Sequence, residues 1–225
     1  MDHRAAQVAA VAALAEPTRR RLYDHVVRQA EPVGRDEVAA ALGVPRATVA
    51  FHLDRLVADG LLDVHFERRS GRTGPGAGRP AKLYRRSGDP VAVSLPERHY
   101  DLAGELLAAA LTEAEASGER PAAVLGRRAH DRGRELAAAD GARGRDAVLR
   151  VLEAHGYEPR VAGDAVTLRN CPFHTLARAH TELVCGMNLR LVEGVLDAAE
   201  PSGLAARLQP EDGACCVRLD GARDG

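Results

Sequence analysis

Hydrophobic and polar residues alternate most regularly between residues 35 and 62, in RDEVAAALGVPRATVAFHLDRLVADGLL. An amphipathic pattern over residues 36–42 predicts a short helix, and Gly43 ends it because glycine accepts the left-handed conformation. Pro45 suits the first turn of a second helix, where its missing N–H costs nothing. The second helix has one inward face, on which apolar residues repeat at i, i+4 and i+7: Val49, Leu53 and Leu56.

Helix, tight turn and helix in this order predict a helix-turn-helix, whose second helix enters the major groove of DNA. The candidate DNA contacts are the residues left on the outer and flanking faces of that helix: Arg46, Ala47, Thr48, Phe51, His52 and Arg55. We expect Arg46, Thr48 and His52 to reach base edges, because arginine can make a bidentate contact to guanine. A helical hairpin without nucleic acid is the alternative interpretation of the two helices.

Two strand-like segments follow the second helix and favour DNA binding. LLDVHFERR (61–69) and AKLYRRS (81–87) can pair around the Gly- and Pro-rich loop SGRTGPGAGRP (70–80), which makes a winged helix-turn-helix. We expect Arg55, Arg72, Arg79 and Lys82 to hold phosphates or the minor groove. The alternative for the loop, a basic segment that adds only sequence-independent attraction, stays open.

Helical patterns also flank this region. An alanine-rich helix is predicted over residues 4–14, with a stripe of Val8, Val11 and Leu14, and a second helix runs from Pro17 to about Gln29. After a hinge at 88–90, helices are predicted over 95–116 and 121–139. Helices after a winged domain commonly pair two protomers, so we expect a homodimer that reads two half-sites of a double-stranded operator.

The C-terminal region has an α+β pattern. Helices are predicted over 145–155, 172–179 and 182–199, and strands over 157–161, 165–169, 204–209 and 215–219. The fold class is therefore α+β. The domains are predicted as a winged helix-turn-helix (1–90), a helical linker or dimerisation region (91–140) and a cysteine-bearing α+β sensor domain (141–225).

Composition narrows the protein class. The chain has 225 residues, 45% of them hydrophobic, and a net charge of -1. Residues 1–90 hold 15 Lys and Arg against 11 Asp and Glu, whereas residues 91–225 hold 16 against 21, so the positive charge lies with the predicted DNA-binding domain. No apolar run is long enough to cross a membrane, and the N-terminus lacks the pattern of a secretory signal. We expect a cytoplasmic protein without a membrane partner.

All four cysteines lie after residue 170. Cys171 precedes Pro172, which predicts a position at a helix N-terminus that favours a thiolate. Cys185 falls in the next helix. Cys215 and Cys216 fall in a predicted strand, so we assign Cys215 inward and Cys216 outward. Thiolates bind iron–sulfur clusters and zinc, but no CxxC pairing is present, so metal binding and buried free cysteines both stay open.

The winged helix-turn-helix, with TVAFHLDRLVADGLL as its recognition-helix pattern, resembles the ArsR-like regulators. The order of this pattern, a wing ending GRPAKLY and a cysteine-bearing C-terminal region is similar to SufR-type regulators. That resemblance implies a dimeric repressor with an iron–sulfur cluster, expected as 4Fe–4S, on Cys171, Cys185 and Cys215. The spacing from Cys171 to Cys185 is one residue longer than the family pattern, and the doublet leaves Cys216 open as the third ligand.

Three functions stay open at this point. The first is a repressor whose operator affinity depends on an iron–sulfur cluster. The second keeps DNA binding but replaces the cluster with zinc, a thiol switch or a small-molecule effector, with His174 or His180 as candidate further ligands of a metal. The third is an enzyme that uses Cys171 and His174 as nucleophile and base, although no third residue is visible to orient the histidine. We expect a regulator and not an enzyme.

Overall fold

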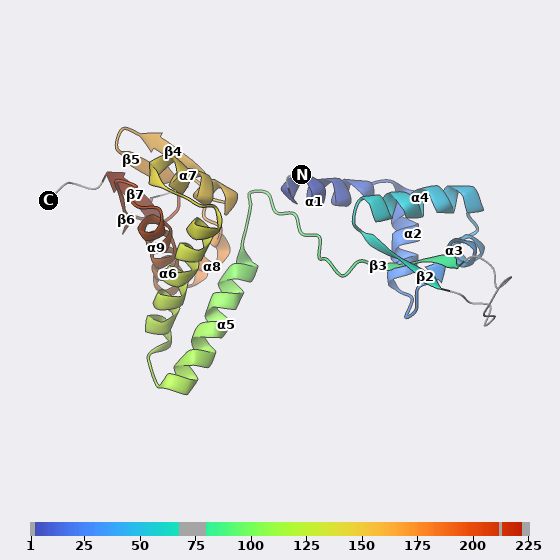
Figure 1. Cartoon of the computed structure of the whole chain (residues 1–225), viewed down its shortest axis with the longest axis horizontal. Coiled ribbons are helices and arrows are strands. Elements are labelled where there is room, and N and C mark those ends of the chain that lie inside the picture. Colours follow the sequence, from blue (N-terminus) through green and yellow to red (C-terminus); the bar gives the residue numbers. More distant parts are fainter. Residues whose placement is uncertain (1–2, 68–79, 212, 222–225) are drawn as a thin grey trace. The chain divides into compact units, whose positions relative to one another are not determined.

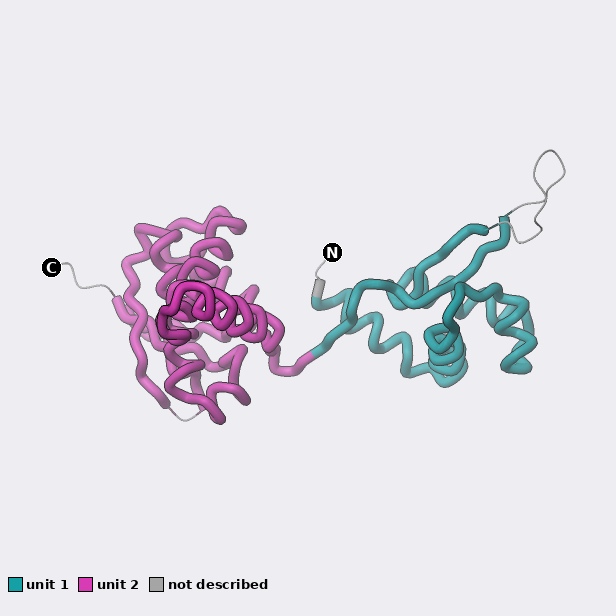
Figure 2. Tube along the Cα trace, turned by 90° about the horizontal axis from the view of Figure 1, so that it is seen from below, with its two compact units in different colours: residues 1–93 teal, residues 94–225 magenta. Residues whose placement is uncertain are grey.

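The computed structural model describes residues 3–67, 80–211 and 213–221, and it divides the chain into two compact units (Figure 1, Figure 2). Unit 1 comprises residues 1–93 and unit 2 comprises residues 94–225. Each unit has its own hydrophobic core. Unit 1 thus ends three residues after the expected boundary, whereas residues 94–140 belong to the same unit and core as the α+β region.

Unit 1 has the architecture of a winged helix-turn-helix. Its elements are α1 (His3–Ala13), α2 (Pro17–Val27), β1 (Val33–Gly34), α3 (Arg35–Leu42), α4 (Arg46–Ala58), β2 (Leu62–Glu67) and β3 (Ala81–Arg86). The strands are antiparallel in the order β1–β3–β2. The β2–β3 ladder runs from Leu62 opposite Arg86 to Glu67 opposite Ala81, which confirms the predicted strand pair. Arg72 and Arg79 lie outside the described residues.

The helix-turn-helix forms for the reasons visible in the sequence. Gly43 ends α3 with a φ of 65°, a left-handed conformation that glycine adopts without strain. The inward face of α4 is fully buried at all three predicted positions, Val49, Leu53 and Leu56. Pro45 stands one residue before α4 and is its N-cap, not part of its first turn. Glu16 caps α2 by accepting hydrogen bonds from the backbone N–H groups of Thr18 and Arg19.

The predicted buried stripe of α1 is wrong. Ala10 and Ala13 are the buried residues, whereas Val8 and Val11 are 44% and 49% exposed and Leu14 is half-buried. The two alanines lie three residues apart and therefore on one face of the helix. Their small side chains let α1 lie close against the core of unit 1. The face of α1 that packs against the core is therefore the one with small residues, and the larger apolar residues face solvent.

Unit 2 combines helices with one antiparallel sheet. Its elements are α5 (Tyr100–Ser117), α6 (Pro121–Ala139), α7 (Gly144–Ala154), β4 (Pro159–Ala162), β5 (Ala165–Leu168), α8 (His174–Ala179), α9 (Thr181–Ala198), β6 (Leu204–Leu208) and β7 (Val217–Gly221). The strand order is β4–β5–β7–β6, and Thr167 of β5 and Arg207 of β6 both pair with Arg218 of β7. The mixed helix and sheet content agrees with the expected α+β class.

The helix expected from residue 95 begins at Tyr100. Residues 97–99 do not join it, because their hydrogen bonds go to the loop between β5 and α8: the His99 N–H donates to the Pro172 carbonyl at 3.1 Å. Within the described ranges, no helix is both long and apolar enough to cross a bilayer.

Helices α6 and α9 lie side by side and touch through their backbones (Figure 1). A Cβ added at Gly133 of α6 would lie 2.0 Å from the Leu191 carbonyl oxygen, and one added at Gly194 of α9 would lie 1.9 Å from the His130 carbonyl oxygen. Both distances are far below an ordinary contact, so only glycine permits this approach. The paired glycines therefore set the distance between the two helices.

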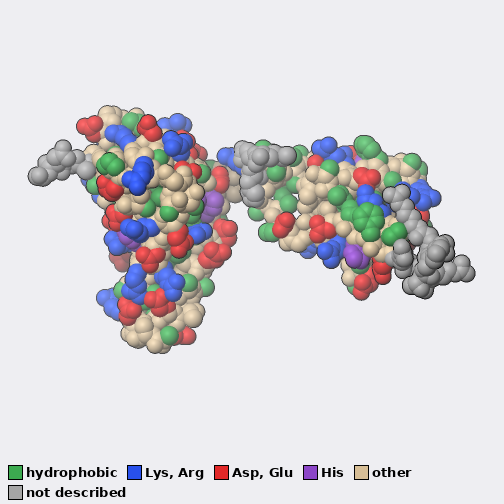
Figure 3. Space-filling model, viewed as in Figure 1, with side chains coloured by type: hydrophobic (Ala, Val, Ile, Leu, Met, Phe, Trp, Pro, Cys, Tyr) green, Lys and Arg blue, Asp and Glu red, His purple; other side chains and the backbone are tan. Residues whose placement is uncertain are grey.

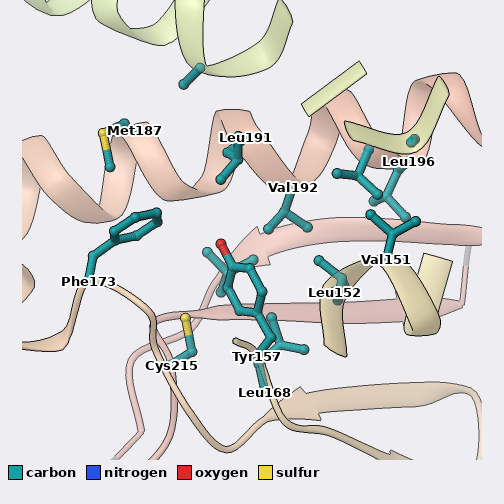
Figure 4. Close-up of a cluster of buried hydrophobic side chains, with 14 of the residues drawn as sticks. Val151, Leu152, Tyr157, Leu168, Phe173, Met187, Leu191, Val192, Leu196 and Cys215 are labelled. Atoms are coloured by element: carbon teal, nitrogen blue, oxygen red, sulfur yellow. The ribbon is translucent and has the colours of Figure 1, made fainter. Parts of the chain in front are cut away.

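The core of unit 2 lies between α9 and the sheet. Figure 4 shows the Tyr157 ring pointing toward α9, below Leu191 and Val192, with the Cys215 side chain nearby. Tyr157 is 3% exposed and Cys215 is 2% exposed. The core thus contains a phenol and a thiol among its apolar side chains.

Candidate functional site

The exposed face of α4 carries the residues that the sequence predicts for DNA. Arg46, Ala47, Phe51 and Arg55 are exposed, and Thr48 is half-buried. Phe51 is 66% exposed on this face, which leaves an aromatic side chain free to contact a partner. An apolar side chain at such a position can contact the methyl group of thymine in the major groove.

The described basic residues of this face are paired with carboxylates. The Arg46 Nε lies 2.5 Å from the Asp36 Oδ1, and both side chains are about three-fifths exposed (60% and 63%). The Arg55 Nε donates to the Asp59 Oδ2 at 2.9 Å. The exposed pair of Arg46 and Asp36 contributes only about 0–1 kcal/mol, so a DNA phosphate can replace the Asp36 carboxylate at little cost. The Asp59 side chain is only 8% exposed, so its pair with Arg55 is costlier to exchange. Figure 3 shows acidic and basic side chains interspersed on the visible face of each unit.

A third pair links α4 to the wing strands. The Asp54 Oδ1 accepts from the Lys82 Nζ at 2.5 Å and from the Tyr84 hydroxyl at 2.8 Å. Burial raises the pKa of Asp54, but the hydrogen bonds from Lys82 and Tyr84 outweigh that effect and leave the pKa below its usual value. Burial and the Asp54 carboxylate together raise the pKa of Tyr84, so the phenol stays a donor. Asp54 therefore fastens β3 to the exposed face of α4.

His52 is the least accessible of the predicted base contacts. Its side chain is 13% exposed, and its Nδ1 lies 3.7 Å from the Glu16 Oε2. The Arg19 Nε donates to the same nitrogen at 3.5 Å, and the ring packs edge-on against Phe51. The structure thus places His52 against the start of α2, beside the aromatic residue that points outward.

The four cysteines come together in unit 2 from three segments of the chain. Cys171 lies between β5 and α8, Cys185 lies in α9, and Cys215 and Cys216 lie just before β7. The Cys215 thiol lies close enough to the thiols of Cys171 and Cys216 to shift their pKa values, and Cys185 and Cys216 affect each other in the same way. Cys171, Cys185 and Cys215 are buried, and Cys216 is half-buried. The four cysteines among the predicted ligand residues thus lie close together.

The expected orientations of the doublet and of Cys171 need correction. Because β7 begins at Val217, the doublet is not in a strand, and its two thiols touch each other instead of facing opposite sides. Cys171 is not at a helix N-cap, since α8 begins at His174 and Phe173 is its N-cap. The expected burial of Cys215 and the greater exposure of Cys216 are confirmed.

Hydrogen bonds divide the thiols into acidic and weakly acidic members. The Cys215 thiol lowers the pKa of Cys171 and lowers that of Cys216 to about 6, although burial opposes both changes. The same hydrogen bonds, with burial, raise the pKa of Cys215. Burial raises the pKa of Cys185 to about 12. Cys216 is therefore disposed to be a thiolate, the form that binds metals, and the pKa of Cys171 is shifted in the same direction.

A buried amide also touches the sulfurs. The Asn188 Nδ2 donates to the Cys215 Sγ at 3.1 Å, and the Tyr157 hydroxyl donates to the Asn188 Oδ1. Asn188 is 1% exposed and Tyr157 is 3% exposed. Because the Tyr157 hydroxyl occupies the amide oxygen, the amide nitrogen is directed at the sulfur. Hydrogen bonds to sulfur are one of the means by which a protein tunes a bound cluster.

The sulfur donors fit a thiolate-ligated group by their chemistry, since cysteine thiolates are the usual ligands of iron–sulfur clusters and also bind zinc. Among the described residues, no group of three or more His, Cys, Asp or Glu side chains is placed so that it could hold a metal ion. The thiols here hydrogen-bond to one another, and metal binding would have to release their protons and replace those contacts. His174 and His180 are exposed at the two ends of α8.

Residues 14–65 match a family described as a helix-turn-helix domain. The match covers α2, α3, α4 and most of β2. No curated protein matches the chain. A helix-turn-helix domain indicates a DNA-binding transcriptional regulator, in agreement with the exposed face of α4, and points to a regulator rather than an enzyme.

Two residues of the candidate sites, Asn188 and Asp54, were not predicted from the sequence. Asn188 interrupts the buried apolar stripe of α9, four residues after Val184 and four before Val192. A polar residue at a core position needs a buried partner, so this position carried a usable signal. The sequence signal for Asp54 was weaker. An acidic residue on a predicted DNA-binding face has no evident role until β3 is placed beside it.

Proposed function

We propose that this protein is a dimeric winged-helix repressor whose affinity for its operator is controlled by an iron–sulfur cluster on the cysteines of unit 2. The observation that carries the proposal is the meeting of four thiols from three separate segments in a chain with a helix-turn-helix domain. Cysteines that only fill a core have no need to contact one another. Their convergence favours a shared ligand over the interpretation as separate buried cysteines.

In this proposal the exposed face of α4 reads DNA. Arg46 and Phe51 would contact base edges, and Arg55 and Lys82 would exchange their carboxylate partners for phosphates. A homodimer would present two such helices to two half-sites, which raises affinity through the effective concentration of the second helix. His52 would support Phe51, because its ring is packed against Phe51 and is mostly covered.

Cys171 and Cys185 would hold the cluster, with Cys215 or Cys216 as a third ligand. When bound, a cluster of this kind, expected as 4Fe–4S, supplies a redox-active centre that is sensitive to iron supply and oxidants. The Asn188 amide donates to sulfur, and the Tyr157 hydroxyl holds that amide in place. The buried side chains around the sulfurs exclude water from the site.

The test is anaerobic purification, followed by a visible absorption spectrum and iron, sulfide and zinc analysis of the same sample. We expect a brown protein with iron and sulfide, and we expect Cys171→Ser and Cys185→Ser to lose both. Cys215→Ser and Cys216→Ser, compared with each other, identify the third ligand. Arg178→Ala, at an exposed position on α8, is the control and should keep the cluster, and His174→Ala tests the exposed histidine as a further ligand. A colourless protein after reconstitution with ferrous iron and sulfide would refute cluster binding.

The operator side of the proposal needs its own assay. A duplex selected from a random pool supplies the site, and fluorescence anisotropy measures its affinity with and without the cluster. We expect the cluster to change the dissociation constant at least fivefold, within the usual range of coupling between two sites. Equal affinities in the two states would leave DNA binding intact but refute control by the cluster.

A thiol switch or zinc site is the second candidate function, favoured by the hydrogen bond between the sulfurs of Cys171 and Cys215. The pKa of Cys171 is lowered, so its thiolate can attack an oxidised neighbouring sulfur to form a disulfide, and it can also bind zinc. A colourless preparation with stoichiometric zinc, or a disulfide found by mass spectrometry after diamide treatment, would support this function. The cysteine enzyme receives no such support: the His174 backbone N–H donates to the Cys171 carbonyl at 3.1 Å, but among the described residues no hydrogen bond joins the Cys171 thiol to the His174 ring.

A further inference from the structure

The segment that connects the two units is bound to the loop that carries Cys171. We call residues 94–99 the connecting segment and residues 169–173 the cysteine loop. The His99 N–H donates to the Pro172 carbonyl at 3.1 Å, and the Arg98 Nη1 donates to the Cys171 carbonyl at 3.2 Å. One residue further on, the Tyr100 hydroxyl donates to the Thr175 Oγ1 at 2.9 Å. Three consecutive residues therefore donate to residues 171–175.

Asn170 lies at the centre of this contact. It is 6% exposed, and its amide nitrogen donates to the Glu97 carbonyl at 3.0 Å and to the Gly156 carbonyl. Its amide oxygen accepts from the Arg98 guanidinium. The side chain thus uses both its nitrogen and its oxygen to join the connecting segment, the end of α7 and its own loop. Such a buried and satisfied amide holds its neighbours in one arrangement.

The packing around the connecting segment is close. A Cβ added at Gly156 would lie 3.1 Å from the His99 ring and 3.3 Å from the Glu97 Cβ, and the φ of Gly156 is +77°. The segment therefore has little room between the turn after α7 and the cysteine loop. A displacement of Cys171 or Asn170 has to move residues 97–99 or break their hydrogen bonds.

The geometry points to Asn170 and Arg98 as the positioning residues that transmit the state of the Cys171 sulfur to the connecting segment. The inference rests on the proposed function, because it supposes that Cys171 changes its ligand or its oxidation state. Cys171 follows Asn170 directly in the sequence. The connecting segment begins at residue 94, immediately after residue 93, where unit 1 ends. A change at the sulfur would thus alter how the residues next to the DNA-binding unit are held.

Hydrogen exchange of the full-length protein tests this without relying on DNA. The amide of His99 is followed by mass spectrometry in the reduced protein, after reconstitution with ferrous iron and sulfide, after addition of Zn²⁺, and after oxidation with diamide. We expect its exchange rate to change at least fivefold when the thiols are occupied or oxidised. Arg98→Met and Asn170→Ser should remove that response. Arg178→Met, an exposed position on α8, is the matched control and should keep it.

Operator affinity supplies the second readout. In wild type the dissociation constant should differ at least fivefold between the two thiol states, and Arg98→Met should bring this ratio close to one while iron content and spectrum stay unchanged. The inference is overturned if Arg98→Met and Asn170→Ser both keep the wild-type ratio of dissociation constants. It is also overturned if the exchange rate of the His99 amide does not change under any thiol treatment. A colourless protein whose His99 amide still responds to diamide refutes the cluster but supports the coupling.

Discussion

Replacing Gly133 with alanine forces apart the two helices that form the centre of unit 2. The new Cβ would lie 2.0 Å from the Leu191 carbonyl oxygen and 2.9 Å from the Val195 nitrogen. Both obstacles are backbone atoms of α9, so no side chain can rotate away. The helices have to separate by about 1 Å, and a gap of this size forfeits roughly a quarter to a half of the dispersion energy of each affected contact.

The expected loss follows from two opposing effects. Overpacking a core costs about 1–3 kcal/mol, and we place this position at ~3 kcal/mol because the obstacle is rigid. Alanine favours a helix over glycine by up to ~1 kcal/mol. We therefore expect Gly133→Ala to lower the free energy of unfolding of unit 2 by about 2 kcal/mol. At ~4 °C per kcal/mol for a unit of this size, its melting temperature should fall by about 8 °C.

Differential scanning calorimetry of the full-length chain measures the transition of unit 2. Gly126→Ala is the matched control on the same helix, seven residues earlier, where an added Cβ would meet only the Arg190 Cγ at 3.6 Å. The same substitution should there be neutral or stabilising by up to ~1 kcal/mol. If Gly133→Ala and Gly126→Ala shifted the transition equally, the close approach of α6 and α9 would be refuted.

Three further outcomes are expected. Asp54→Asn should weaken the acid sensitivity of unit 1, because the lowered pKa of Asp54 stabilises the folded unit above about pH 4 and this contribution is lost as pH falls. The contribution is below ~1 kcal/mol because the carboxyl is exposed. The melting temperatures of the variant and of wild type should therefore converge between about pH 6 and about pH 3. Phe51→Ala should weaken binding to a selected duplex about tenfold in fluorescence anisotropy, with an unchanged urea midpoint because Phe51 is 66% exposed. Asn188→Leu should cost about 2 kcal/mol in urea unfolding by leaving the Tyr157 hydroxyl unsatisfied, and adding Tyr157→Phe should recover part of that loss; a further loss would contradict the buried hydrogen bond.

The helix-turn-helix was predictable because its signals are local. Gly43 fixes the turn through its own backbone, and the three apolar residues of α4 point inward whatever lies around them. The wing strands were predictable for the same reason, since they alternate around a Gly- and Pro-rich loop. Most elements of unit 2 also lie within a few residues of their expected ranges.

The features that escaped prediction depend on contacts between distant segments. The start of α5 moved to Tyr100 because residues 97–99 bind a loop more than 70 residues away in sequence. The thiols of Cys215 and Cys216 touch each other because the strand begins later than its apolar pattern indicates. The sequence supplied candidate sulfur ligands, but not the fact that Cys216 contacts Cys185 or that Asn188 donates to sulfur.

The carboxylates beside Arg46, Arg55 and Lys82 have a consequence for how this protein would search a genome. The carboxylates compete with DNA phosphates for the same cations, so each cation stays largely neutralised until it binds DNA. Attraction to arbitrary DNA depends on unpaired positive charge, so these three cations should add little to it. Fewer molecules would then be held at random sequences. The margin between the true site and the rest of the chromosome would widen through weaker background, without any stronger contact at the site itself.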